Sequence, residues 1–469
     1  MSTEYFESPL PSARTMRRVT WAAAAGNTIE TYDYAVYGFL AVVLAKLFFP
    51  NTQPGIALLS TFAVFGVAFL VRPLGSLLFG TIADRFGRRT SLLGTLALVT
   101  GATTMIGLLP TVDSIGIWAP VLLVLMRLLQ GLAAGGEYST AMVYAAEFTP
   151  QNRRGAMTSR VQLGSVVSLL LAAGAILLLN TVLTAEAMTA WGWRIPFLLA
   201  LPMGLFGIYI RTRLEESPEF QAMAKAGEVP SSPAKEAFAR HWNLIILVFG
   251  VAAFQQIGYY VAFTYAQSYI IELGFTHGQA TLATAISIAV AVVLVAVGGP
   301  IADRVGRWPM LLGLSGAMIV VVYPLFTGLS SAESVPVLIL MTVALGILPA
   351  LYTSVAPATY IEILPAEVRG TIFAVGFALA AALLGGPALY ISQFLIETTG
   401  DERAPAFFVM LGAVLSLVAA LAVRRRRPTV LLADRMPTAG AVSAERVDLA
   451  PAGVLDKLPG KAIRCAPRS

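Results

Sequence analysis

Five ionisable side chains stand inside long apolar stretches of this sequence: Glu30, Asp33, Arg72, Arg127 and Glu137. A charge at the centre of a membrane span costs about 2.5–3.5 kcal/mol even on lenient insertion scales, so such groups usually have a function. Arginine keeps its proton in proteins, whereas a carboxylate can gain one. Three acids against two guanidiniums leave one carboxylate without a fixed cation, and desolvation favours its protonated form. The set therefore predicts a site that exchanges a proton.

The first two acids are three residues apart. A helix places Glu30 and Asp33 on a shared face with Asn27 and Tyr37, roughly 15–20 Å from the start of their stretch and near the bilayer midplane. We expect Glu30 or Asp33 to take up the proton, with Glu137 as a third candidate, and Asn27 and Tyr37 to contact a solute. The alternative is a fixed ion-pair network that orders the helices and touches no solute.

The two arginines suit a solute carboxylate, because a planar guanidinium binds one through two parallel hydrogen bonds. Arg127 lies deeper in its stretch and is the first candidate, and Arg72 is the second. A third arginine, Arg160, stands close to the start of its stretch. We expect its long side chain to reach the membrane interface instead of a binding site.

A polar and aromatic stripe occurs in the second half of the chain at Gln256, Tyr259 and Tyr260. Tyrosine rings can face a cation, and amides can form hydrogen bonds without adding charge. We expect these residues to form the second half of the solute site. Packing between helices is the alternative interpretation.

The composition shows which elements must position these residues. Of 469 residues, 57% are apolar and 12% are charged, against about 45–50% and about 25% in soluble domains. A helical span needs about 20 apolar residues, and stretches this long without two-residue alternation exclude barrel strands. We predict an all-α, polytopic membrane protein with twelve transmembrane helices, at about 20–47, 56–79, 91–110, 117–147, 157–182, 193–211, 243–272, 279–302, 309–329, 335–361, 371–396 and 405–423.

The formal net charge of +6 is a topology signal and not a nucleic-acid surface, because most loop arginines fall on alternate loops. The positive-inside rule places both termini in the cytoplasm of a multi-pass protein of the plasma (inner) membrane. The predicted domains are a cytoplasmic N-terminus (1–19), an N-terminal six-helix bundle (20–211), a cytoplasmic central loop (212–240), a C-terminal six-helix bundle (241–427) and a cytoplasmic, disordered tail (428–469).

Two loop signatures occur once in each half. A Gly-x-x-x-Asp-Arg-x-Gly-Arg pattern begins at Gly80 and again at Gly299, and a Glu-x-x-Pro pattern followed by Arg-Gly begins at Glu147 and again at Glu362. Both pairs join the same spans of each half, which indicates an internal duplication.

These loops resemble the signature loop of the major facilitator superfamily, and further motifs resemble its metabolite:proton symporter branch. The motifs are GNTIETYDY at 26–34, RPLG at 72–75, RLLQG at 127–131 leading into GGE at 135–137, WGWRIPF at 191–197 and EESPEF at 215–220. Thr31 departs from the usual Trp of the branch, and Arg160 stands where an aromatic is common. The resemblance implies alternating access between two six-helix halves, and a solute such as a dicarboxylate, citrate, shikimate, proline or betaine.

The resemblance also implies that the repeated loops close the cytoplasmic side of the bundle. An aspartate there can accept hydrogen bonds from a neighbouring helix N-terminus, and the arginines can pair with the two glutamates. The predicted gate residues are Asp84, Arg85, Arg88, Arg89, Glu147, Arg154, Asp303, Arg304, Arg307, Glu362 and Arg369.

We therefore predict proton-coupled symport of a small carboxylate-bearing metabolite, with sodium as the alternative coupling ion. The alternatives are a proton-coupled exporter of amphiphilic compounds and an osmosensing transporter. The sequence has neither a Walker loop nor a nucleophile beside a base, and its two histidines, His241 and His277, stand at span ends. We expect no enzyme activity, no cofactor and no metal. The expected partners are a small solute and the lipid bilayer, with no nucleic acid, and the chain is expected to act as a monomer.

Overall fold

In the computed structural model the described residues are 13–50, 53–86, 88–135, 138–139, 142, 151–212, 233–364 and 369–433, and their regular elements are all helical. The long helices are rich in apolar residues throughout, as expected of segments that satisfy their own backbone hydrogen bonds in lipid. We call residues 13–212 the N-terminal half and residues 233–423 the C-terminal half.

The N-terminal half contains α1 (Ala13–Phe39), α2 (Ala41–Phe48), α3 (Pro54–Leu70), α4 (Arg72–Phe86), α5 (Arg88–Leu108), α6 (Val112–Ile115), α7 (Trp118–Ala133), α9 (Arg154–Val182), α10 (Ala185–Ala187), α11 (Arg194–Leu198) and α12 (Ala200–Thr212). The C-terminal half contains α14 (Pro233–Tyr260), α15 (Ala266–Glu272), α16 (His277–Val305), α17 (Arg307–Ser330), α18 (Val335–Ile363), α19 (Arg369–Ala380) and α20 (Ala388–Thr399), and begins α21 (Pro405–Ala433).

Two long spans of the C-terminal half contain a turn of π-helix. One turn, at Val261–Tyr265, joins α14 to α15, and the other, at Ala381–Gly385, joins α19 to α20. Such turns occur frequently at functional sites because they rotate the side chains that follow.

The described helices account for the twelve predicted spans and confirm the all-α class. Nine are long and apolar enough to cross a membrane, one bent pair is long and apolar enough when taken together, and Leu93–Leu108 and Trp118–Ala133 are shorter apolar helices. The first span is broken, with a bend of 64° between Gly26–Phe39 and Ala41–Phe48. The predicted boundaries at 1–19, 212–240 and 428–469 lie largely outside the described residues and stay predictions.

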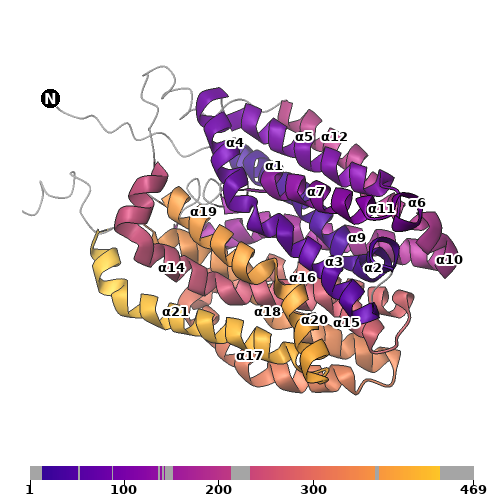
Figure 1. The fold of residues 1–469 in the computed structure, drawn as a ribbon. Coiled ribbons are helices and arrows are strands. Elements are labelled where there is room, and N and C mark those ends of the chain that lie inside the picture. Colours follow the sequence, from indigo (N-terminus) through magenta and orange to yellow (C-terminus); the bar gives the residue numbers. More distant parts are fainter. Residues whose placement is uncertain are drawn as a thin grey trace, which may run out of the picture. The chain divides into compact units, whose positions relative to one another are not determined.

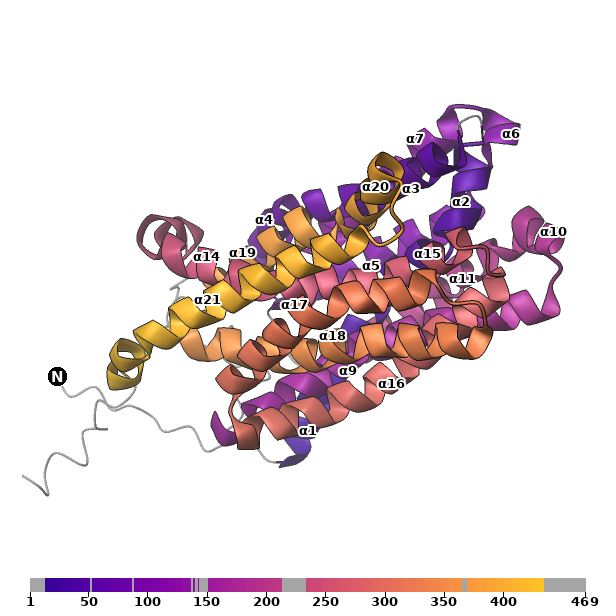
Figure 2. The same ribbon diagram turned by 90° about the horizontal axis from the view of Figure 1, so that it is seen from below.

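The two halves meet chiefly along α9, which packs against α16 and α18, and along α3, which packs against α20. Figures 1 and 2 show the indigo-to-magenta helices of the N-terminal half beside the rose-to-yellow helices of the C-terminal half, with α9 and α16 side by side. Gly299 of α16 allows this approach, since a Cβ there would collide with the backbone of Gly155 and the side chain of Ser159. Further contacts join α1 to the π-helical turn at Val261–Tyr265 and α4 to α19, so two helices that carry predicted site residues also border the other half.

Candidate functional site

A cavity of about 60 Å³ lies between the halves. We call it the central cavity. It has room for roughly four water molecules, and small-molecule pockets usually measure about 300–1,000 Å³, so a bound solute must push side chains apart. Its lining includes Asn27, Glu30, Thr31, Tyr34, Arg72 and Tyr138 from the N-terminal half and Gln255, Gln256, Tyr259, Tyr260, Thr353 and Phe377 from the C-terminal half.

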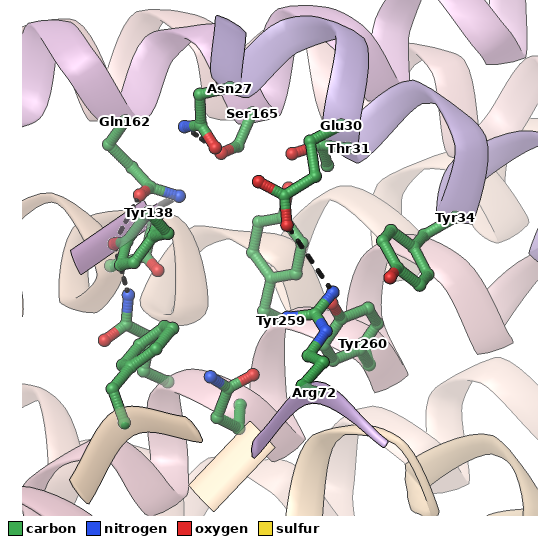
Figure 3. A pocket seen from close by; sticks show the side chains of 14 residues that line it. Asn27, Glu30, Thr31, Tyr34, Arg72, Tyr138, Gln162, Ser165, Tyr259 and Tyr260 are labelled. Atoms are coloured by element: carbon green, nitrogen blue, oxygen red, sulfur yellow. Dashed lines mark hydrogen bonds and ion pairs between the residues drawn. The ribbon is translucent and has the colours of Figure 1, made fainter. Parts of the chain in front are cut away.

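A buried ion pair lies on the cavity wall. The Arg72 guanidinium lies 3.8 Å from the Glu30 carboxylate, as Figure 3 shows, and Glu30 is 7% exposed. The same guanidinium is stacked over the rings of Tyr34, at 4.6 Å, and Phe69, at 4.2 Å. The Arg72 Nε has no hydrogen-bond partner among the described residues. At 3.8 Å the pair is long for a charge-assisted hydrogen bond, so Arg72 can accept a second carboxylate.

A second buried ion pair of the N-terminal half lies away from the cavity. Asp33 and Arg127 are 3.4 Å apart and almost completely buried. Asp33 also accepts hydrogen bonds from Thr103, at 2.7 Å, and from Gln130. The Arg127 guanidinium donates to Gln130, at 2.9 Å, and to the Phe65 carbonyl, at 3.1 Å. This cluster has the geometry of the fixed network that was the alternative interpretation.

The structure places Arg72 on the cavity wall and Arg127 away from it. Depth in the sequence favoured Arg127, but Arg72 lines the cavity, whereas both terminal nitrogens of Arg127 donate hydrogen bonds within the N-terminal half. Both Glu30 and Asp33 have an arginine partner. The third acid of the set of three acids and two arginines is Glu137, which lies outside the described residues.

Most of the other predicted solute-binding residues line the cavity. Asn27 donates to Ser165 at 2.6 Å on one wall, and Gln256, Tyr259 and Tyr260 form the opposite wall. Tyr37 is an exception: its hydroxyl donates to the Thr61 carbonyl at 3.1 Å, and its ring lies 4.5 Å from the Arg127 guanidinium. Tyr37 thus packs within the N-terminal half.

Sequence reasoning missed a polar chain that crosses between the halves beside the cavity. Tyr360 donates to Gln255 at 2.6 Å, Gln255 donates to Tyr138 at 3.3 Å, and Tyr138 donates to Gln162 at 2.8 Å. The Tyr138 ring is stacked on Phe377 at 4.6 Å. Buried amides in apolar stretches were the available signal, but helical spacing drew attention to Gln256 and not to its neighbour.

Several predicted gate residues meet where α9 begins. The Asp303 carboxylate, from α16, accepts hydrogen bonds from the backbone N–H groups of Gly155 and Ala156, both at 2.9 Å. Arg307 donates to Asp303 at 2.8 Å and forms an ion pair with Glu362. A carboxylate at a helix N-terminus is favourable because it faces unpaired N–H groups and the positive end of the helix dipole. One half is thereby joined to the other.

The loop signature explains part of this geometry. Gly306 has φ of 100°, a conformation that a side chain disfavours, and its turn lets α17 start with Arg307 beside Asp303. Arg304 and Arg160 are exposed and take no part, and Arg154 is the first residue of α9. The side chains of Asp84, Arg85, Arg88, Arg89 and Arg369, and the whole of Glu147, lie outside the described residues.

The family now follows from comparison with known sequences. The sequence model of the family described as sugar (and other) transporters matches residues 19–240 and 224–423. This chain belongs to that family and is a secondary active transporter of the major facilitator superfamily.

Individual members of the family with known names are also similar to this chain. The glycine betaine/proline/ectoine/pipecolic acid transporter OusA of Dickeya dadantii is 34% identical over 421 residues, covering 87% of this chain and 83% of that protein. The citrate-proton symporter of Klebsiella pneumoniae is 32% identical over 412 residues, covering 88% of this chain and 92% of that protein. The solved structure of the proton:xylose symporter XylE is similar in fold, with a TM-score of 0.73 and 20% identity over 88% of this chain and 96% of that one.

Proposed function

We propose that this transporter takes up a small zwitterion bearing a carboxylate, together with a proton. The observation that carries the proposal is the Glu30–Arg72 pair on the wall of a cavity otherwise lined by amides, hydroxyls and aromatic rings. Among the described residues of that lining, Arg72 is the one cation. A single guanidinium suits one carboxylate better than a polyanion such as citrate.

Coupling follows from competition for Arg72. While Glu30 is ionised, it holds the guanidinium, and a solute carboxylate would have to displace it. When Glu30 is protonated, that attraction is lost and Arg72 is free to bind the solute in a low-dielectric site where the pair is strong. Proton and solute therefore favour each other's binding, and both leave when the halves rock to the other side.

The aromatic rings suit the positive end of the same solute. Tyr260 lies edge-on to Phe69, at 5.4 Å, and to Tyr259, at 5.5 Å, next to Arg72. A solute cation can lie against ring faces for about 0.5–2 kcal/mol. A proline- or betaine-like solute presents both ends at once, and the name of the Dickeya relative includes such compounds.

A panel of labelled solutes tests the substrate class. In proteoliposomes with a fixed inward proton gradient, we expect accumulation of L-proline, pipecolate or glycine betaine, and competition among them. Citrate, shikimate and xylose are expected to compete poorly. Accumulation of citrate or xylose without any zwitterion would contradict the proposal, and empty liposomes and liposomes with dissipated gradients are the controls.

We also propose that the Asp303 cluster closes the cytoplasmic side, with both termini in the cytoplasm of the plasma membrane. Asp303→Asn removes the charge that faces the α9 N-terminus. We expect closure to weaken by about 1–2 kcal/mol, or roughly 5–30-fold in the open-to-closed ratio. The measurement is the rate at which an impermeant maleimide labels Thr31→Cys in inside-out vesicles, in a Cys465→Ser background.

The matched control for this variant is Asp401→Asn, which removes an acid from the loop before α21. Asp84→Asn tests the equivalent position of the first half. Unchanged transport and unchanged labelling in both Asp303→Asn and Asp84→Asn would remove the gate role.

A further inference from the structure

Two hydroxyl groups on the C-terminal wall of the central cavity have no hydrogen-bond partner among the described residues. They are the Tyr259 Oη of α14 and the Thr353 Oγ1 of α18. The side chains are only 7% and 1% exposed, so bulk water does not compensate them. A buried hydroxyl without a partner is unfavourable, and native proteins usually pair such groups.

Two neighbouring amide side chains of the cavity are paired within the protein. Asn27 donates to Ser165, and Gln255 bonds both Tyr360 and Tyr138. On the N-terminal wall the Tyr34 hydroxyl and the Arg72 Nε also have no hydrogen-bond partner among the described residues, so unpaired polar groups face each other across the cavity.

The Tyr259 ring is also held in place. It lies edge-on to Tyr260, at 5.5 Å, and to Phe263, at 5.4 Å, so the hydroxyl cannot readily turn to another partner. Figure 3 shows Tyr259 on the side of the cavity opposite the helix that carries Glu30 and Thr31. A solute that binds Arg72 through its carboxylate would present its other end toward this wall.

The proposal rests on the function proposed above: we infer that Tyr259 and Thr353 are specificity residues that accept hydrogen bonds from the N–H groups of the solute's ammonium. The transporter then selects primary and secondary amines, such as proline-type imino acids, over fully N-methylated betaines. A quaternary ammonium has no N–H and leaves both hydroxyls unpaired. Sites built to hydrogen-bond a solute group reject the analogue that lacks it far more strongly than apolar pockets reject a change of size.

L-Proline and N,N-dimethyl-L-proline test this inference, because they share ring and carboxylate and differ in the N–H groups. Uptake of each is measured in proteoliposomes under one fixed proton gradient, giving kcat and KM separately. We expect the wild type to prefer proline by at least about tenfold in kcat/KM. Tyr259→Phe and Thr353→Val should each lower this preference by about fivefold or more, through the KM for proline, and the double variant should bring it close to one.

The dimethylated solute is the internal control for folding, because its uptake should persist in all three variants. Tyr323→Phe and Thr398→Val repeat the same chemical changes away from the cavity and should keep the wild-type preference. An equal rise of both KM values would overturn the inference, since the hydroxyls would then serve the carboxylate or the shape of the site. A wild type without preference, or variants that retain it, would overturn it too. If the wild type transports neither solute, the proposed function itself fails.

Discussion

Replacing Glu30 by glutamine is expected to abolish accumulation of solute while leaving exchange intact. Glutamine keeps the size of the side chain but cannot ionise, so Arg72 stays available whether or not a proton is present. A gradient of two pH units at zero membrane potential can drive up to about 100-fold accumulation with one proton per solute. We expect this ratio to fall to about one in Glu30→Gln, while counterflow of labelled against unlabelled solute continues. The solute affinity should also lose its dependence on external pH.

Asp113→Asn is the matched control, because it removes an exposed acid from the short helix α6. It should accumulate solute like the wild type. Gradient-driven accumulation by Glu30→Gln would assign the proton to another acid, and Asp33→Asn would then be the next variant. If both variants accumulate solute, neither acid of the first span carries the proton.

The second large effect is expected from Arg127→Met, which should lower the free energy of unfolding. The guanidinium neutralises Asp33 in a cluster with almost no exposure. Removing one partner of a buried pair leaves an uncompensated charge, which usually costs about 3–5 kcal/mol. We expect a large drop in the melting temperature of the detergent-solubilised protein. The double variant Asp33→Asn/Arg127→Met should recover much of the loss, because the asparagine can keep the hydrogen bonds from Thr103 and Gln130 without a charge.

Arg160→Met is the control for these two variants, because Arg160 is exposed on α9. The Arg160→Met protein should have a melting temperature close to that of the wild type. The opposite pattern would be an Arg127→Met protein that is stable but binds solute poorly. That result would indicate that Arg127 binds the solute, and it would contradict the proposal that Arg72 binds the solute carboxylate.

Patterns that depend on composition and local spacing predicted the fold. Long apolar stretches determined the all-α class, and the repeated loops indicated a duplication of the bundle. The acid of one repeated signature, Asp303 near the end of α16, accepts hydrogen bonds at a helix N-terminus as its position in the signature suggested. The break of the first span after Phe39 and the π-helical turns were not predicted, because apolar composition continues across them.

The site was harder to predict because helical spacing gives neighbours only approximately. Glu30 and Asp33 are three residues apart, or about 300° around the helix, so their side chains diverge by about 60°. That difference turns Glu30 toward the cavity and Asp33 toward Thr103 and Arg127. We ranked Arg127 above Arg72 because it lies deeper in its span. Depth along a span does not tell which neighbouring helix or cavity a side chain faces, so this ranking could not identify the arginine on the cavity wall.

The central claim is that a proton moves with each solute and that Glu30 carries it. The most direct measurement is the internal pH of proteoliposomes, reported by a trapped dye, when L-proline or a solute identified by the panel is added without any imposed gradient. We predict acidification of the lumen that needs no sodium and is absent in Glu30→Gln. Solute entry without acidification, or acidification that persists in Glu30→Gln, would contradict the account.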